Sequence, residues 1–333
     1  MAVFFRGGYG DPPRKAVDYF RRGEMPTLTV SVIIAAGGAG RRFAVAAGGG
    51  TAYAGGADGF RSLTDRAPDP LTPAPLPLMP HPDPLSRLSK AFMPLAGRPI
   101  LAHTLDRFAA VESVAEVIVA VPAACIVEAR ERFGQTLAGK GQPGRGQEPY
   151  AVKVPDPFPA AGRPLIFVAG GEDRVASVAL ALAATDPKTD LVAIHDAVRP
   201  LIRPAVIREV LRAAAEHGGA VAGRPVDHTV KRIADGQRIV ETVPRERLWI
   251  AQTPQAFRRD VIVRAYAERA RAGPGITDDA QLVEALGLEV VMVQCDAANL
   301  KITTPEDLRL CEALLAAGFA SASPWRAGWP FGE

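Results

Sequence analysis

The stretch Val30–Phe43, VSVIIAAGGAGRRF, is the one around which the rest of the chain is organised. Its first half is apolar and β-branched, which is typical of a strand buried on both faces of a parallel sheet. Small residues follow over 35–40, where backbone N–H groups can approach a ligand closely and bind an anion. Arg41 and Arg42 then add fixed positive charge. The stretch predicts a phosphate-binding loop at the end of a strand.

Two common phosphate-binding motifs do not fit this loop. A P-loop needs a Lys-Ser or Lys-Thr after its glycines, and none is present. The dinucleotide pattern G-x-G-x-x-G fits Gly38 and Gly40, but its third glycine is replaced by Phe43. A plain glycine-rich turn after a core strand remains the alternative, and the adjacent arginines favour phosphate.

Composition narrows the class of protein. The chain has 333 residues, ordinary hydrophobic and charged fractions of 48% and 23%, and a net charge of +3. Basic stripes with interleaved aromatic residues are missing, so no nucleic-acid partner is expected, while anionic small molecules suit the charge. No apolar run approaches the roughly 18 residues of a membrane span, so no membrane partner is expected. The three cysteines lack C-x-x-C spacing, which argues against a disulfide framework or a zinc site and favours a cytoplasmic location.

Proline and glycine content divides the chain. Residues 1–27 lack the apolar segment of a signal peptide and are expected to form a disordered extension. Residues 44–86 are rich first in Gly and Ala and then in Pro, which predicts a flexible insertion that bulges from the domain. A proline-rich docking segment is the alternative. A second insertion is expected at 134–163 and a tail at 321–333, leaving one domain over 28–320.

Strands and helices alternate along the ordered part. Strands are expected at 30–34, 116–121, 165–169 and 191–196, with helices from Pro99 and at 122–133, 174–184 and 204–217. This alternation predicts an α/β fold with a mostly parallel, doubly wound sheet, whose ligands gather at the carboxyl ends of its strands. The clusters at 35–42, 170–174 and 195–199 all fall at such ends.

The C-terminal third has a different texture. Short β-rich runs at 228–233 and 238–243 flank Asp235-Gly236, which predicts a projecting hairpin. Such a hairpin is a plausible dimerisation arm, at about 224–250. Helices are expected at 258–270, 277–286 and 305–317, with strands at 289–294 and 299–303.

Several motifs occur in a recognisable order: AAGGAGRRF, KAFMPLAGRPIL, GGEDRVASV, IHDAVRP, HTVKR, ETVPRERLW, QTPQAF, ITDDA and NLKITTPEDL. Over about residues 28–318, apart from the two insertions, the chain resembles the 2-C-methyl-D-erythritol 4-phosphate cytidylyltransferases. The resemblance implies a Rossmann-like nucleotidyltransferase fold. It also implies transfer of CMP from CTP to methylerythritol phosphate, with release of pyrophosphate, in non-mevalonate isoprenoid synthesis.

That chemistry explains the charged residues. A phosphate oxygen of the alcohol phosphate attacks the α-phosphorus of CTP, and a phosphate monoester needs no catalytic base. Catalysis then consists of aligning two anions and stabilising the charge of the transition state, for which Arg, Lys and Mg²⁺ are suited.

The resemblance assigns roles residue by residue. The catalytic cations it implies are Arg42, Lys90, Arg245 and Lys301. The nucleotide and substrate contacts it implies are Ala36, Gly37, Gly38, Gly40, Gly171, Glu172, Arg174, Ser177, Asp196, Ala197, Arg199, Thr229 and Thr253. Asp196 is the candidate ligand of the Mg²⁺ cofactor, with a turn-capping aspartate as the alternative. His195 is expected to be a packed structural residue rather than a proton carrier.

The resemblance also implies a homodimer, in which the arm carries Thr229 and Arg245 into the site of the partner subunit. The chain departs from the family pattern in three places: about 47 residues separate Arg42 from Lys90, Gly37 stands where a second alanine is usual, and Glu172 stands where an aspartate is usual. Two other functions remain open. One is a cytidylyltransferase for another polyol phosphate, such as ribitol 5-phosphate, and the other is a non-catalytic nucleotide-binding subunit.

Overall fold

The computed structural model of the chain describes residues 28–37, 89–134 and 162–319. The extension expected at 1–27, the insertion at 44–86, most of the insertion at 134–163 and the tail at 321–333 lie outside these residues. Gly38, Gly40 and Arg42 lie outside them too.

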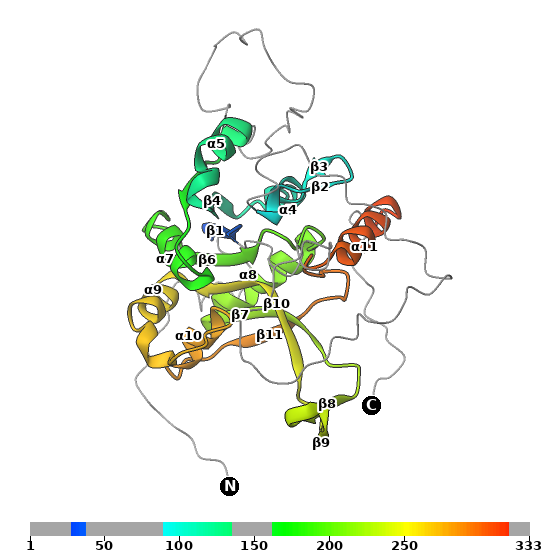
Figure 1. Ribbon diagram of the computed structural model, residues 1–333. Helices are drawn as coiled ribbons and strands as arrows, with labels where there is room; N and C mark the ends of the chain where they lie inside the picture. The colour runs from blue at the N-terminus through cyan, green and yellow to red at the C-terminus, as the bar shows by residue number, and fades with distance from the viewer. Residues whose placement is uncertain (1–27, 38–88, 135–161, 320–333) are drawn as a thin grey trace, which may run out of the picture.

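A seven-stranded sheet forms the centre of the molecule (Figure 1). Its strands follow the order β11-β7-β10-β6-β1-β4-β5, and every neighbouring pair is parallel except the two that involve β10. The predicted α/β fold with a mostly parallel sheet is therefore confirmed. The strands are β1 (Val30–Ala35), β4 (Val114–Val121), β5 (Leu165–Ala169), β6 (Leu191–Asp196), β7 (Gly219–Pro225), β10 (Trp249–Arg258) and β11 (Val291–Gln294).

Strand β1 lies between β4 and β6, at the point where the strand order reverses. Val32 and Ile34 pack into the core on one face of the sheet, and Ile33 packs into the core on the other. The strand thus has the two buried faces that its β-branched run predicts. The reversal places β1 at the switch point where open α/β sheets bind their ligands.

Helices cover both faces of the sheet (Figure 1). One face packs against α4 (Ile100–Ala109), α5 (Ile126–Gly134) and α8 (Pro204–His217). The other packs against α7 (Arg174–Ala183), α9 (Arg259–Ala267) and α10 (Ala280–Glu284). No helix in the described ranges is long and apolar enough to cross a membrane.

A smaller core lies beside the carboxyl edge of the sheet. There α11 (Pro305–Ala316) packs against the two-stranded sheet of β2 (Pro94–Leu95) and β3 (Arg98–Pro99). Leu95, Ile302 and Cys311 are fully buried in this core. The core therefore holds the segment after η2 (Lys90–Phe92) next to the segment that contains Lys301.

The predicted hairpin is present and projects from the body of the molecule (Figure 1). Strands β8 (Val230–Ile233) and β9 (Ile239–Val243) pair only with each other, through the turn η4 (Asp235–Gln237). Ile233, Ile239 and Val240 each expose more than half of their surface. We call residues 226–248 the arm.

Several sequence expectations were wrong in detail. Residues 299–303 form no strand, because this segment lies against the turn after β6 and shares with it one backbone hydrogen bond, from Ile302 N–H to the Val198 carbonyl. The helix expected at 277–286 shortens to α10, and the one at 258–270 ends in the turn η5 (Arg269–Ala272). Strands β7 and β10 were not anticipated as members of the main sheet. The small residues of β7 do not alternate in polarity, and only its partners identify it as a strand.

Candidate active site at the carboxyl edge of the sheet

Asp196, the last residue of β6, is the centre of a cluster of cations. Its carboxylate lies 2.9 Å from Lys301 Nζ, 3.3 Å from Arg199 Nε and 3.5 Å from Arg174 Nε. These cations come from the segment after β11, the turn after β6 and the first residue of α7. Four of the predicted site residues, from three segments that are distant in sequence, therefore meet at the carboxyl ends of the parallel strands.

The cluster fixes the charge of Asp196. Burial alone would raise the pKa of this carboxyl, but Lys301, Arg174 and Arg199 together hold it well below its usual range. Arg174 behaves in the opposite sense: burial would lower its pKa, and Asp279 and Asp196 raise it well above its ordinary value. Asp196 and Arg174 are therefore both ionised at neutral pH.

The turn after β6 is joined to its surroundings by backbone hydrogen bonds. Ala197 N–H donates to the Ala35 carbonyl, which links the turn to the end of β1. The Val198 carbonyl accepts from Ile302 N–H, and Arg199 Nη1 donates to the Asn299 carbonyl at 2.8 Å. Ala197, a predicted nucleotide contact, is thus a buried link between β1 and β6.

Thr253 lies beside the same turn. It is 5% exposed, its Oγ1 accepts a hydrogen bond from Asp196 N–H at 3.1 Å, and the same oxygen is 3.0 Å from His195 Nδ1. The Thr253 hydroxyl therefore forms its hydrogen bonds within the protein, and its predicted contact with the nucleotide stays a prediction.

Lys90 reaches this edge despite the long segment that precedes it. Its Nζ donates to the carbonyl of Ile302 at 3.1 Å, one residue from Lys301. The preceding Ser89 donates from Oγ to the Ala36 carbonyl at 2.6 Å. The loop after β1 and the segment that carries Lys90 are therefore directly bonded, which is the arrangement that the predicted role of Lys90 requires.

The glycine pair after β5 forms the neighbouring wall. A Cβ at Gly170 would lie 2.8 Å from Ser177 Oγ, and one at Gly171 would lie 2.5 Å from the Ala176 Cβ, so the close approach of this loop to α7 requires glycine. Ser177 Oγ accepts from Gly171 N–H and donates to the Asp173 carbonyl. A Cβ at Gly37 would lie 3.5 Å from the same oxygen. Ser177 thus braces the loop, next to the end of β1, while Glu172 is exposed to solvent.

A buried network behind Arg174 was not anticipated from the sequence. The Asp279 carboxylate, 0% exposed, accepts from Arg174 Nη2 at 2.7 Å and from the Tyr266 hydroxyl at 2.6 Å. Gln255 accepts in addition from Asp279 N–H. The motif ITDDA, which includes Asp279, was noticed without a role, and pairing with a buried arginine could be found only once the fold was known.

The predicted site residues of the arm lie away from the Asp196 cluster. Thr229 and Arg245 are exposed, and Arg245 donates to the Asp227 carbonyl within the arm. In the described part of the chain, no hydrogen bond or ion pair joins either residue to the Asp196 cluster. Figure 1 shows the arm on the far side of β10 from β1. One chain therefore brings together the predicted cations of its body but not those of its arm.

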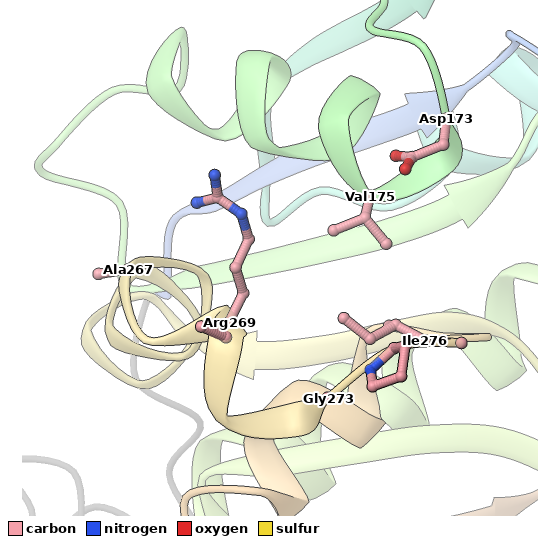
Figure 2. Close-up of a pocket in the computed structure, with 9 residues that line it drawn as sticks. Asp173, Val175, Ala267, Arg269, Gly273 and Ile276 are labelled. Atoms are coloured by element: carbon pink, nitrogen blue, oxygen red, sulfur yellow. The ribbon is translucent and has the colours of Figure 1, made fainter.

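A cleft of about 680 Å³ lies next to this edge, between the start of α7 and the turn η5. Figure 2 shows Asp173 and Val175 on one side and Arg269, Gly273 and Ile276 on the other. None of the predicted site residues lines it. The cleft is therefore distinct from the Asp196 cluster.

Comparison with known proteins shows which family the chain resembles in sequence. The family model described as IspD, 2-C-methyl-D-erythritol 4-phosphate cytidylyltransferase, matches residues 85–317. A protein of that name from Solibacter usitatus (strain Ellin6076) is 40% identical over 229 residues, which cover 68% of this chain and 84% of the relative.

Solved structures agree. The 2-C-methyl-D-erythritol 4-phosphate cytidylyltransferase of Thermus thermophilus is 35% identical, with a TM-score of 0.52, covering 68% of this chain and 94% of that one. A 4-diphosphocytidyl-2C-methyl-D-erythritol synthase from Anaerococcus prevotii shares the fold, at 22% identity and a TM-score of 0.58, covering 87% of this chain and all of that one. The chain belongs to the 2-C-methyl-D-erythritol 4-phosphate cytidylyltransferase family.

Proposed function

We propose that this chain transfers CMP from CTP to 2-C-methyl-D-erythritol 4-phosphate, forming 4-diphosphocytidyl-2-C-methyl-D-erythritol and pyrophosphate for isoprenoid synthesis. One observation carries the proposal beyond family membership: cations from four separate segments gather at the switch point of the sheet. Lys90, Arg174, Arg199 and Lys301 carry four positive charges, and their partners Asp196 and Asp279 carry two negative ones. These six side chains therefore carry a net charge of +2, which suits a triphosphate.

The chemistry requires this net positive charge. The attacking phosphate and the triphosphate repel each other, and negative charge grows on the leaving pyrophosphate as the bond to the α-phosphorus breaks. We propose that Lys90 and Lys301 stabilise this charge as compact point charges, together with Arg42. Arg174 and Arg199 are partly buried and held by carboxylates, so we propose that they orient the nucleotide from fixed positions.

The loops on either side supply the remaining contacts in this proposal. The backbone N–H group of Gly37 would meet the nucleotide, and Gly38 and Gly40 have the same proposed role. Those of Ala36 and Gly171 already donate to the Ala120 carbonyl and to Ser177 Oγ, so these two residues would contact the nucleotide through their small surfaces, while Ser177 holds the base-reading loop in shape. We propose that this loop reads the cytosine base and that a purine is too large for it.

The described residues do not form a magnesium site by themselves. No group of three or more His, Cys, Asp or Glu side chains suited to a metal ion occurs among them. Asp196 is the candidate ligand, and both of its oxygens already face cations. A magnesium ion would need most of its oxygen ligands from the triphosphate and from water, so no step is assigned to a metal held by the protein.

The arm supports a proposed homodimer. Its apolar side chains Ile233, Ile239 and Val240 are exposed in the single chain, and Thr229 and Arg245 lie away from the cluster. We propose that the arm packs against a second copy and delivers these two residues to the methylerythritol phosphate in the partner's site. The cysteines Cys125, Cys295 and Cys311 are buried free thiols, which suits the reducing cytoplasm proposed as the compartment.

The test is pyrophosphate release by the purified full-length protein with Mg²⁺. CTP with 2-C-methyl-D-erythritol 4-phosphate should give turnover, whereas ATP, GTP or ribitol 5-phosphate should give at least about 10²-fold less. Equal turnover with ribitol 5-phosphate would move the assignment to another polyol phosphate. Absence of pyrophosphate release with every polyol phosphate would leave a nucleotide-binding role only.

A pair of lysine variants tests the cluster. Lys90→Met should lower kcat by about 10³-fold, because a cation at the reacting phosphates is lost. Lys188→Met, at an exposed loop before β6, removes the same charge and should leave kcat unchanged. A Lys90 variant with normal kcat and only a raised KM for CTP would contradict the proposed role.

A further inference from the structure

His195 is fully buried next to the cluster and has no role in the proposed reaction. It precedes Asp196 in β6, and its ring packs edge-on against Phe108 of α4 at 5.0 Å between centroids. Its two ring nitrogens both have polar partners: Nδ1 lies 3.0 Å from Thr253 Oγ1, and Nε2 lies 3.2 Å from the Arg199 carbonyl.

These partners define one tautomer. A carbonyl oxygen only accepts, so Nε2 must carry a proton and donate it to Arg199. His195 is fully buried and its two ring nitrogens face a carbonyl and a hydroxyl, so the ring is neutral and Nδ1 is an acceptor. Thr253 Oγ1 then donates to Nδ1 and at the same time accepts from Asp196 N–H. The result is an unbroken chain from Asp196 N–H through Thr253 and His195 to the Arg199 carbonyl.

The two ends of this chain are the two ends of one turn. Asp196 and Arg199 are themselves joined by a backbone hydrogen bond from Arg199 N–H to the Asp196 carbonyl. The side chains of both residues belong to the cation cluster, 3.3 Å apart. The turn has no other buried side chain that bonds to both of its ends within the described residues.

We propose that His195 and Thr253 are positioning residues for the transferase reaction, which hold the 196–199 turn so that Asp196 and Arg199 face the other cations correctly. This inference rests on the proposed function for its kinetic test, and on the hydrogen bonds alone for its structural one. Both residues act through the turn and not on the reacting atoms.

Variants can separate the two halves of this series of hydrogen bonds. In His195→Asn the amide oxygen takes the place of Nδ1, and in His195→Gln the amide nitrogen takes the place of Nε2. Each keeps one bond and loses the other. Both should lower kcat by about 10²-fold, since a misplacement of about 1 Å has that effect, with KM for CTP changed by less than about threefold. Thr253→Val should match them, and Thr253→Ser, which keeps the hydroxyl, should restore kcat to within about threefold.

The matched control is Phe108→Leu, which removes the packing partner of the same ring without touching a hydrogen bond. It should lower the melting temperature at least as much as His195→Asn while leaving kcat within about twofold. If Phe108→Leu and the His195 variants lose kcat in proportion to their loss of stability, His195 is only a packed core residue and the proposal is overturned.

Hydrogen exchange gives a second readout that needs no activity. Arg199 N–H donates to the Asp196 carbonyl within the turn, and Ala197 N–H donates from the turn to the Ala35 carbonyl of β1. These two amides should exchange at least about tenfold faster in His195→Gln and Thr253→Val than in Phe108→Leu. Equal protection in all three overturns the positioning role. If the wild-type protein fails to turn over CTP while the variants still show this difference in exchange, the proposed function is refuted and the positioning role of His195 and Thr253 stands.

Discussion

Removal of the Asp279 carboxylate is the perturbation whose cost the structure defines best. Asp279 is 0% exposed and accepts from both Arg174 and Tyr266. In Asp279→Ala the Arg174 guanidinium keeps only Asp196, 3.5 Å away, and its Nη1 is already buried without a partner among the described residues. The Tyr266 hydroxyl, in a residue that is 4% exposed, loses its acceptor.

Two terms set the magnitude. Breaking a buried ion pair by removing one partner costs about 3–5 kcal/mol, and the lower end applies because the Arg174 side chain keeps 27% of its exposure. An unsatisfied buried hydroxyl costs about 1–3 kcal/mol, and the two terms overlap because they share one carboxylate. We expect a loss of about 3–4 kcal/mol in the free energy of unfolding, which for a domain of this size lowers Tm by roughly 7–14 °C.

Urea unfolding, followed by circular dichroism, measures this cost. The control is Asp106→Ala, which breaks the Arg98–Asp106 pair at 2.8 Å, almost the same distance, but with side chains 34% and 35% exposed. That exposed pair should contribute less than about 1 kcal/mol. Asp279→Asn keeps an acceptor for Tyr266 and should fall between the two. Equal losses for Asp279→Ala and Asp106→Ala would refute the argument that burial sets the strength of the Arg174 pair.

Three further predictions concern other parts of the site. Ser89→Ala leaves the buried Ala36 carbonyl without its 2.6 Å partner and should cost about 1 kcal/mol in urea unfolding, whereas no measurable loss would show that the bond does not anchor this segment. Burial lowers the pKa of His195 to about 4, so between about pH 6.5 and pH 4 the imidazole is protonated in the unfolded chain but not in the folded one. The free energy of unfolding therefore falls by up to about 3 kcal/mol as the pH is lowered through this window. A variant His195→Gln should lack this part of the pH dependence, and an unchanged profile would mean that another group titrates. If the arm is shared, inactive Lys301→Met and Arg245→Ala proteins should recover up to about a quarter of wild-type activity when mixed as dimers, and no recovery in verified mixed dimers would argue against sharing.

Much of the fold could be predicted because local patterns are strong where the sheet is parallel. The β-branched run of β1 and the strand–helix alternation up to residue 217 predicted strands and helices close to where they lie. The local sequence pattern fails to predict a strand where contacts with a neighbouring strand determine the structure. Gly223 in β7 is a poor strand former, and a Cβ there would lie 2.8 Å from the Ile250 carbonyl, so this strand exists because β10 packs closely against it.

The candidate site divides in the same way. Residue type and position at strand ends indicated Asp196 and Arg174, the family resemblance indicated Lys301, and the structure brings their side chains together. Asp279, the partner of Arg174, carried no such signal, and His195, although it lies in the cluster 195–199, was expected only to be a packed structural residue. Asp279 stands 105 residues from Arg174, and an aspartate in an irregular segment is equally common as a turn residue.

The sequence by itself determined the class of fold and the kinds of charge available at the strand ends, because periodicity and residue type act locally. Only the tertiary structure decided which charges neutralise each other. Four cations and two carboxylates from segments far apart in the chain become one cluster only when β1, β6, α7 and the segment after β11 meet at a single edge. Electrostatic energy depends on separations of a few ångströms, and those distances are set by packing rather than by spacing along the chain.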